Sequence, residues 1–353
     1  MTDFGTVLVT GGAGFIGCAI SSQLAERFER VVAVDNLHPQ IHAQQVRPQA
    51  LDERVELVVG DVTDAEMWDG LLADMHPAMI VHLAAETGTG QSLTESNRHA
   101  SVNVVGTTQM LDALSRNEKL PKRIVLASSR AVYGEGAWRG ADGELFYPGP
   151  RPLRMFEAGQ WDFSDAEPVA MDARTVSPQP ASVYAVTKLA QEQLLRIWGD
   201  AYGVQIGIVR LQNVYGPGQS LNNSYTGILS LFCRQAREGK TISLYEDGEI
   251  RRDFILIDDV AEAIVACLVG DDTDPTPIDI GSGEFQTIAT AAQLIAEHYG
   301  APTPVVTGQF RHGDVRHAWA DPSAAEKRLG FKARYSLREG IDRLTAWIEG
   351  QLN

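Results

Sequence analysis

The chain of 353 residues carries 46 acidic side chains against 30 of Lys and Arg, which gives a formal net charge of −16. This charge disfavours a protein that binds the phosphate backbone of nucleic acids, because such a protein needs a basic surface. The hydrophobic share of 44% is ordinary for a soluble globular protein, and no apolar run reaches the roughly 18 residues that a membrane-spanning helix requires. We expect a cytoplasmic protein with neither nucleic acid nor membrane as a partner.

Short apolar runs alternate with amphipathic helical patterns through the first half of the chain. The runs, each typical of a strand buried on both faces, cover residues 7–9, 31–34, 55–59, 79–83, 124–126 and 205–211. Helical patterns lie near residues 64–74, 97–116 and 181–202. This alternation predicts an α/β protein with a Rossmann-type, doubly wound parallel sheet.

The second half mixes shorter elements. Two strands are predicted, at 242–245 and 254–257, and the helical patterns lie near 258–269, 288–299, 322–329 and 337–350. We therefore divide the chain into a Rossmann domain over residues 1–213 and a smaller α/β C-terminal lobe over residues 214–353, partly interleaved with the first.

One segment, from about residue 136 to residue 180, breaks this pattern. It is rich in Pro and Gly and shows little periodicity, yet it contains six aromatic residues: Trp138, Phe146, Tyr147, Phe156, Trp161 and Phe163. A structureless loop of that length is uncommon, and the aromatic content argues against disorder. We treat this insert as a cover over a ligand pocket, a contact to another subunit, or a loop that packs its aromatics on its own domain.

A glycine-rich loop, Gly12-Ala13-Gly14-Phe15-Ile16-Gly17 with Gly11 ahead of it, follows the first strand and opens a helix. Glycines there permit a tight turn and let the backbone approach a pyrophosphate, which then faces the free N–H groups of the helix N-terminus. Asp35 ends the second strand about 20 residues later, where a carboxylate accepts from a ribose 2′-OH and repels a 2′-phosphate. The pattern favours NAD over NADP; a glycine turn without a ligand is the alternative.

Tyr184 and Lys188 are four residues apart and therefore share one face of the helix predicted at 181–202. A phenol next to an ammonium is suited to take a proton from an alcohol, because the positive charge favours the phenolate. Ser128 and Ser129 follow a buried strand, at the sheet edge where such folds bind ligands, so a hydroxyl there can reach a reacting oxygen. No Cys/His cluster accompanies them, and we expect no metal.

Taken together, these residues resemble those of the extended short-chain dehydrogenase/reductase family, whose members modify nucleotide-linked sugars. The resemblance covers nearly the whole chain and is carried by segments 11–17, 60–62, 82–85, 103–107, 128–134, 184–188, 213–218, 252–254 and 313–314.

The resemblance implies a role for each matching residue. The catalytic residues it implies are Ser129, Tyr184 and Lys188. The residues implied to hold NAD are Gly11, Gly14, Phe15, Ile16, Gly17, Asp35, Asn36, Asp61, Val62, Leu83, Ala84, Ala85, Thr87, Asn103, Tyr184 and Lys188. The residues implied to bind a nucleotide-diphosphate sugar are Thr87, Ser129, Asn213, Asn223, Arg252, Arg311 and Asp314, most of them in the C-terminal lobe.

Arg130 and Ala131 reduce the number of reactions that the resemblance implies. In the family's 4,6-dehydratases these positions hold an Asp-Glu pair that eliminates water, and without that acid and base elimination lacks its proton carriers. A 4-epimerase needs only transient oxidation at C4 by tightly bound NAD, for which Ser129, Tyr184 and Lys188 suffice. A sugar dehydrogenase that releases NADH and a non-catalytic NAD-binding protein are weaker alternatives, the latter because such proteins lose the Tyr/Lys pair.

Segments 86–92 and 129–133, together with the long insert, resemble most those of epimerases that convert dTDP-L-rhamnose to dTDP-6-deoxy-L-talose, a polysaccharide precursor. A 4-epimerase of UDP-glucose or UDP-N-acetylglucosamine is the alternative, because small differences between sugars are decided by pocket shape. In the family, the helices matching 97–116 and 181–202 form a dimer interface, so the resemblance implies a homodimer.

Overall fold

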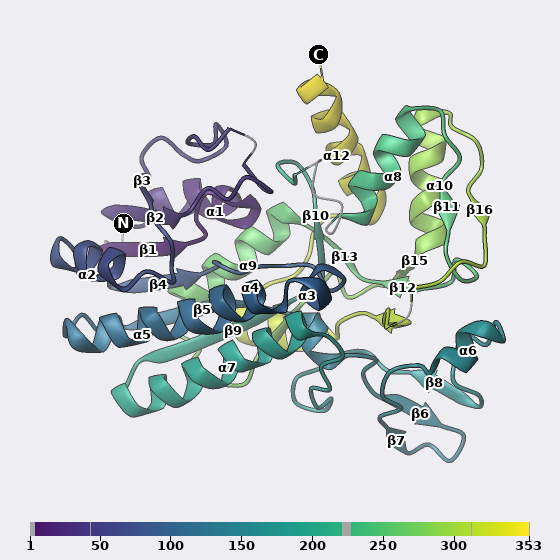
Figure 1. The fold of residues 1–353 in the computed structure, drawn as a ribbon, viewed down its shortest axis with the longest axis horizontal. Helices are drawn as coiled ribbons and strands as arrows, with labels where there is room; N and C mark the ends of the chain where they lie inside the picture. Colours follow the sequence, from purple (N-terminus) through teal and green to yellow (C-terminus); the bar gives the residue numbers. More distant parts are fainter. Residues whose placement is uncertain (1–3, 43, 221–226, 312, 353) are drawn as a thin grey trace.

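The computed structural model describes residues 4–42, 44–220, 227–311 and 313–352. Its centre is a seven-stranded sheet in the order β14-β9-β5-β4-β1-β2-β3 (Figure 1), in which all neighbouring strands run parallel. The strands are β1 (Thr6–Thr10), β2 (Arg30–Asp35), β3 (Glu56–Val59), β4 (Met79–His82), β5 (Arg123–Ser129), β9 (Gln205–Leu211) and β14 (Ile278–Ile280). The predicted Rossmann-type sheet is confirmed.

Helices cover both faces of this sheet because its strands are apolar on both sides. In β1, Val7 and Val9 belong to one core cluster, which includes residues of α1 (Phe15–Ala25) and α9 (Ile257–Val269). Leu8 points the other way, into a second cluster with residues of α2 (Ala65–Ala73), α5 (Gly106–Arg116) and α7 (Val183–Tyr202). This two-sided burial explains the uninterrupted apolar strands in the sequence.

The helical pattern near 97–116 is a continuous stretch of three pieces. α4 (Ser96–Ala100) is followed by a π-helical turn, Ser101–Val105, and then by α5. Single π turns within α-helices are frequent at functional sites. This turn contains Asn103, one of the residues that the family resemblance assigns to the cofactor site.

A smaller lobe packs beside the sheet around its own core, which draws on residues of α8 (Ile228–Arg237), α10 (Ile288–Tyr299) and α12 (Leu337–Leu352). Short strands pair within it: β10 (Asn213–Tyr215) with β13 (Phe254–Leu256), β11 (Ser243–Leu244) with β16 (Val305–Val306), and β12 (Arg251–Arg252) with both β15 (Gln286–Thr287) and β17 (His317–Ala318). Two further short helices are α3 (Gln91–Thr94) and α11 (Ser323–Leu329). β14 comes from the second half of the chain but pairs with β9 in the main sheet, so the two predicted units share this sheet. The division at residue 213 stays a prediction.

The insert has a structure of its own that its sequence did not predict. β6 (Trp138–Gly140) pairs antiparallel with β7 (Leu145–Phe146) and β8 (Ala166–Pro168), and α6 (Leu153–Glu157) lies between the last two in sequence. The indole of Trp138 is fully buried and lies 5.7 Å, between ring centroids, from the ring of His317. The ring of Phe156 stacks on that of Phe310 at 5.0 Å. These two aromatics therefore attach the insert to the C-terminal lobe of the same chain.

Candidate active site

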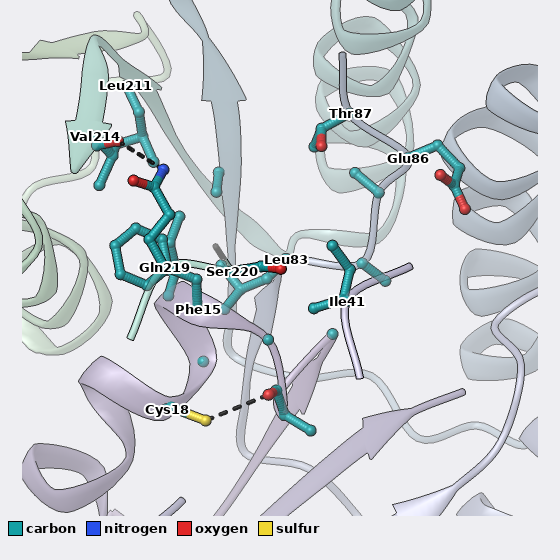
Figure 2. Close-up of a pocket in the computed structure, with 18 of the residues that line it drawn as sticks. Phe15, Cys18, Ile41, Leu83, Glu86, Thr87, Leu211, Val214, Gln219 and Ser220 are labelled. Atoms are coloured by element: carbon teal, nitrogen blue, oxygen red, sulfur yellow. Dashed lines mark hydrogen bonds between the residues drawn. The ribbon is translucent and has the colours of Figure 1, made fainter. Parts of the chain in front are cut away.

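A cavity of about 860 Å³ opens at the carboxyl ends of the central strands, where doubly wound sheets bind ligands. The glycine loop forms one wall, and the segments that follow β2, β4, β5 and β9 form the others. Figure 2 shows side chains around the cavity, among them Phe15, Ile41, Leu83 and Thr87. No residue of the insert (136–180), all of which the structure describes, lines this cavity.

The glycine loop is packed so tightly that side chains would not fit. Gly11 has φ +66° and donates its N–H to the carbonyl of Val34 at 2.7 Å. A Cβ at Gly12 would lie 2.6 Å from the Cβ of Ala33, and one at Gly17 would overlap the backbone of Gly12. Gly14 begins α1 without a side-chain cap, so the first N–H groups of the helix are available to an anion.

Asp35 ends β2 at the cavity wall, and its carboxylate also supports the glycine loop. It accepts hydrogen bonds from the backbone N–H of Ala13 at 3.1 Å and of Leu37 at 2.9 Å. The Nε2 atom of His42 lies 3.8 Å from Asp35 Oδ1, the oxygen that accepts from Leu37. His42 lines the cavity with its neighbours, and no motif in the sequence singled it out.

The other residues assigned to the cofactor fall into two groups. Asn36, Val62, Leu83, Ala84, Ala85 and Thr87 line the cavity with Gly11, Gly14, Phe15, Ile16 and Gly17, whereas Asp61 and Asn103 are not among its lining residues. Asp61 accepts a hydrogen bond from the amide of Asn36 at 3.1 Å. Asn103 is fully buried; it accepts from the N–H of Glu86 at 2.7 Å and donates to the hydroxyl of Thr187 at 2.9 Å. These two residues support the cavity wall from behind.

The three predicted catalytic residues meet in this cavity. Ser129 is the last residue of β5, and Tyr184 lies in the first turn of α7, which Ser182 caps by accepting the N–H of Ala185 at 3.1 Å. The side chains of Ser129 and Tyr184 are hydrogen-bonded. Burial raises the pKa of Tyr184, while the bond to Ser129 and the positive charge of Arg130 act in the opposite direction.

Lys188 follows Tyr184 by one helical turn and is buried. Burial lowers the pKa of its ammonium to about 7, and the nearby carboxylate of Glu192 opposes that shift. Its Nζ donates a hydrogen bond to Gln191 Oε1 at 2.7 Å. Gln191 in turn donates through Nε2 to the hydroxyl of Thr107 at 2.9 Å. Sequence reasoning missed Gln191, because nothing in its spacing separates it from an ordinary polar helix residue.

His82 completes this buried polar chain. Its Nε2 lies 2.9 Å from the hydroxyl of Thr107, and its Nδ1 lies 2.7 Å from the hydroxyl of Thr10, the residue before Gly11. Burial, with the charge of Lys188 acting in the same direction, lowers the pKa of His82 to about 3, so the imidazole is neutral at physiological pH. A continuous hydrogen-bonded chain therefore joins the start of the glycine loop to Lys188.

The residues assigned to the sugar nucleotide are only partly brought together. Thr87, Ser129 and Asn213 line the cavity, whereas Arg252, Arg311 and Asp314 do not, and Asn223 lies outside the described residues. Arg252 is buried and donates to the backbone carbonyls of Arg251, Arg316 and Val315. Arg311 is exposed, with its guanidinium 5.4 Å from the ring centroid of Tyr245. The roles of these residues stay proposals.

Two general properties complete the description of the site. Among the described residues, no group of three or more His, Cys, Asp and Glu side chains is placed to hold a metal ion. Within the same residues, no helix combines the length and the apolar character needed to cross a membrane.

Comparison with known proteins gives a consistent result. Residues 7–281 match the model of the NAD dependent epimerase/dehydratase family. The chain is 57% identical over 353 residues to dTDP-L-rhamnose 4-epimerase of Burkholderia thailandensis, covering 100% of this chain and 97% of that protein. It is 28% identical to UDP-glucose 4-epimerase of Mycolicibacterium smegmatis, over 95% of both chains.

Solved structures agree with the sequence comparisons. UDP-glucose 4-epimerase of Thermotoga maritima with UDP-glucose superimposes with a TM-score of 0.80 at 26% identity, covering 99% of this chain and 100% of that chain. The complex of Thermus thermophilus UDP-glucose 4-epimerase with NAD gives a TM-score of 0.78 at 27% identity, covering 98% and 99%.

Proposed function

The chain belongs to the NAD dependent epimerase/dehydratase family, and we propose that it is a nucleotide-sugar 4-epimerase that converts dTDP-L-rhamnose to dTDP-6-deoxy-L-talose with tightly bound NAD. One observation carries the reaction: Ser129, Tyr184 and Lys188 meet in the cavity that the glycine loop and Asp35 enter. The 57% identity to a dTDP-L-rhamnose 4-epimerase over the whole chain supports the choice of sugar.

The residues present fit NAD. Gly12 and Gly17 leave no room for a side chain, the N-terminus of α1 is free to face a pyrophosphate, and Asp35 ends β2 at the cavity, where a carboxylate suits a ribose hydroxyl. We propose that Asn36, Val62 and the 83–87 segment line the remainder of the cofactor site. Bound NAD would supply the hydride acceptor for the sugar.

In the proposed reaction the chain's own residues transfer a proton and stabilise the groups that exchange it. Tyr184, as phenolate, accepts the proton of the C4 hydroxyl, and Ser129 donates a hydrogen bond to the same oxygen. In the return step Tyr184 gives the proton back to that oxygen, so no proton is consumed overall, and bound NAD would supply again the hydride it had accepted. In this proposal Lys188 favours the phenolate through its positive charge and holds the cofactor ribose.

Two rival reactions fit the site less well. A 4,6-dehydratase would need an acid and a base on the loop after Ser129, where this chain has Arg130 and Ala131. A sugar dehydrogenase would have to release NADH in each turnover. A UDP-glucose or UDP-N-acetylglucosamine 4-epimerase remains the alternative, supported by the structural likeness to UDP-glucose 4-epimerases.

The substrate is tested by incubating the purified protein separately with dTDP-L-rhamnose and with UDP-glucose, without added cofactor, and following the configuration at C4 by proton NMR. We expect the 6-deoxy-talose product from dTDP-L-rhamnose. Tyr184→Phe is the control, because it removes the proton acceptor while leaving the cofactor loop intact. Conversion of UDP-glucose but not of dTDP-L-rhamnose would overturn the choice of sugar, while the assignment as a 4-epimerase would stand.

We also propose that the protein is a homodimer. Large apolar side chains are exposed along the helices that the family resemblance assigns to the interface: Val105, Val186 and Ile197 are 45%, 52% and 72% exposed. Val186 and Ile197 are three turns apart on α7 and therefore lie on one face. The proposal includes a role in polysaccharide biosynthesis, which the chemistry of the proposed product implies, and a cytoplasmic location.

A further inference from the structure

Arg130 occupies an unusual position in the candidate active site. It directly follows Ser129 and begins a short 3₁₀ turn, Arg130–Tyr133, which Ser129 caps by accepting the N–H of Ala131 at 3.2 Å. Arg130 lines the same cavity as Ser129, Tyr184 and Lys188. The turn therefore brings a guanidinium to the place where proton transfer is proposed.

The guanidinium of Arg130 has few partners. Its Nε donates to Asn213 Oδ1 at 3.1 Å, and among the described residues it makes no other hydrogen bond and no ion pair. The buried guanidinium of Arg210 is different, since it forms an ion pair with Glu192 at 2.7 Å. Arg151 likewise pairs with Glu246 at 2.9 Å. The terminal nitrogens of Arg130 thus bring an unpaired positive charge into the cavity.

Four charged or titratable side chains act on the guanidinium of Arg130. The carboxylates of Asp314 and Glu135 act on it from beyond ion-pair distance, as does the phenol of Tyr184, and the guanidinium of Arg252 is near enough to repel it. Burial lowers the pKa of Arg130, because a charged group loses its hydration there. A guanidinium nevertheless stays protonated at physiological pH. Its charge is therefore permanent during the proposed reaction.

Two cationic side chains, those of Lys188 and Arg130, line the cavity together with Tyr184. Lys188 follows it by one turn of α7, but its Nζ is hydrogen-bonded to Gln191 and its own pKa is lowered to about 7 by burial, so its positive charge is incomplete at neutral pH. Arg130 approaches from the β5 side, is charged at any physiological pH, and lowers the pKa of Tyr184. The two cations therefore differ in how constantly they can favour a phenolate.

We propose that Arg130 is a positioning residue that stabilises the phenolate of Tyr184 by its permanent charge, from the turn that follows β5. The proposal rests on the proposed function for the role of Tyr184 as proton acceptor. A carboxylate at this position, as in dehydratases, would repel the same phenolate. An arginine therefore suits a site in which Tyr184 alone exchanges the proton.

The test measures the ionisation of Tyr184 without any sugar substrate. Tyrosinate absorbance of the NAD-loaded protein is titrated against pH, and the titration of Tyr184→Phe is subtracted to isolate Tyr184. In Arg130→Met the midpoint should move to higher pH, and in Arg130→Lys it should move in the same direction but less, because a buried ammonium is only partly charged. Arg154→Met, at an exposed position of α6, is the matched control and should change nothing.

Activity provides a second readout. Turnover of Arg130→Met at pH 7 should fall about tenfold and recover as the pH is raised, with KM little changed. Thermal unfolding of this variant should occur no lower than in the unchanged protein, because the variant removes an unpaired, partly desolvated charge. An unmoved tyrosinate midpoint would overturn the proposal, and so would a raised KM with an unaltered pH profile, which would make Arg130 a sugar contact. Because the titration needs no substrate, a wrong choice of sugar cannot produce an unmoved midpoint.

Discussion

Lys188 donates a 2.7 Å hydrogen bond to the side-chain carbonyl of Gln191. The neighbouring groups determine which end of the Gln191 amide faces Lys188. The hydroxyl of Thr107 donates to the carbonyl of Asn103 at 2.6 Å, so its oxygen is free to accept from the amino group of Gln191 at 2.9 Å. The opposite orientation of the amide would direct its N–H groups at the ammonium of Lys188. Gln191 therefore holds the ammonium of Lys188 in a defined place.

Replacing Gln191 by Leu should destabilise the protein and slow it. The change leaves Lys188 without its acceptor and removes one of the two groups that can donate to the hydroxyl of Thr107, the other being His82, which costs about 1–3 kcal/mol of unfolding free energy. Urea unfolding and turnover measure the two effects. Gln193→Leu, two positions along the same helix but exposed, is the control. Unchanged unfolding and turnover in Gln191→Leu would show that Gln191 does not position Lys188.

Asp35→Ala should change the preference between cofactors. The carboxylate is proposed to accept from the ribose 2′-OH of NAD, and a hydrogen bond to a charged group contributes about 1.5–3 kcal/mol, so NAD affinity should fall at least tenfold. NADP affinity should fall less, because the repulsion of its 2′-phosphate is removed. Calorimetric titration with both cofactors measures this.

Asp35→Asn is the companion variant for this experiment. It keeps an oxygen that can accept from the N–H of Ala13, which the carboxylate does at 3.1 Å, and so separates loop support from ribose binding. Equal losses of both cofactors in Asp35→Ala would contradict the assigned contact.

Gly17→Ala should abolish cofactor binding, because the added Cβ would overlap the backbone of Gly12 and force helix α1 away from the loop. Gly70→Ala is the matched control. Gly70 lies exposed in α2, and an added Cβ would meet nothing within 4 Å. That second change should raise the unfolding free energy by about 0.5–1 kcal/mol, since Ala favours helix more than Gly. NAD binding by Gly17→Ala would rule out the close packing described for the loop.

Ile197→Lys should dissociate the proposed homodimer, because it puts a charge into the apolar face of α7 that would be buried between subunits. Light scattering should then give the mass of one chain. Val59→Lys is the control, since Val59 is 65% exposed on β3, away from that face. If Ile197→Lys is still a dimer, the interface does not include this face of α7.

Local patterns explain what could be predicted from the sequence. Six of the seven strands of the central sheet were predicted because such strands are uninterrupted apolar runs, whereas β14 has only three residues and was not predicted. The glycine loop, Asp35 and the Tyr184–Lys188 pair were found because each lies in a short segment with a fixed spacing.

Other features depend on contacts between distant residues. Gln191 meets Thr107 across 84 positions, and Arg151 meets Glu246 across 95, so no local pattern reveals either pair. The strands of the insert have two or three residues each, too few to show an alternation. Arg252 was matched by a family motif, but its placement behind the cavity wall follows from backbone carbonyls contributed by residues 315 and 316.

The most direct test of the proposed reaction uses dTDP-L-rhamnose carrying deuterium at C4, incubated with the purified protein in ordinary water without added cofactor. Transient oxidation by bound NAD predicts that dTDP-6-deoxy-L-talose forms with the deuterium still at C4, and that no NADH accumulates. Product in which the deuterium has been replaced by hydrogen from water, or NADH formed in proportion to the sugar consumed, would contradict an epimerase that returns the same hydride to the other face.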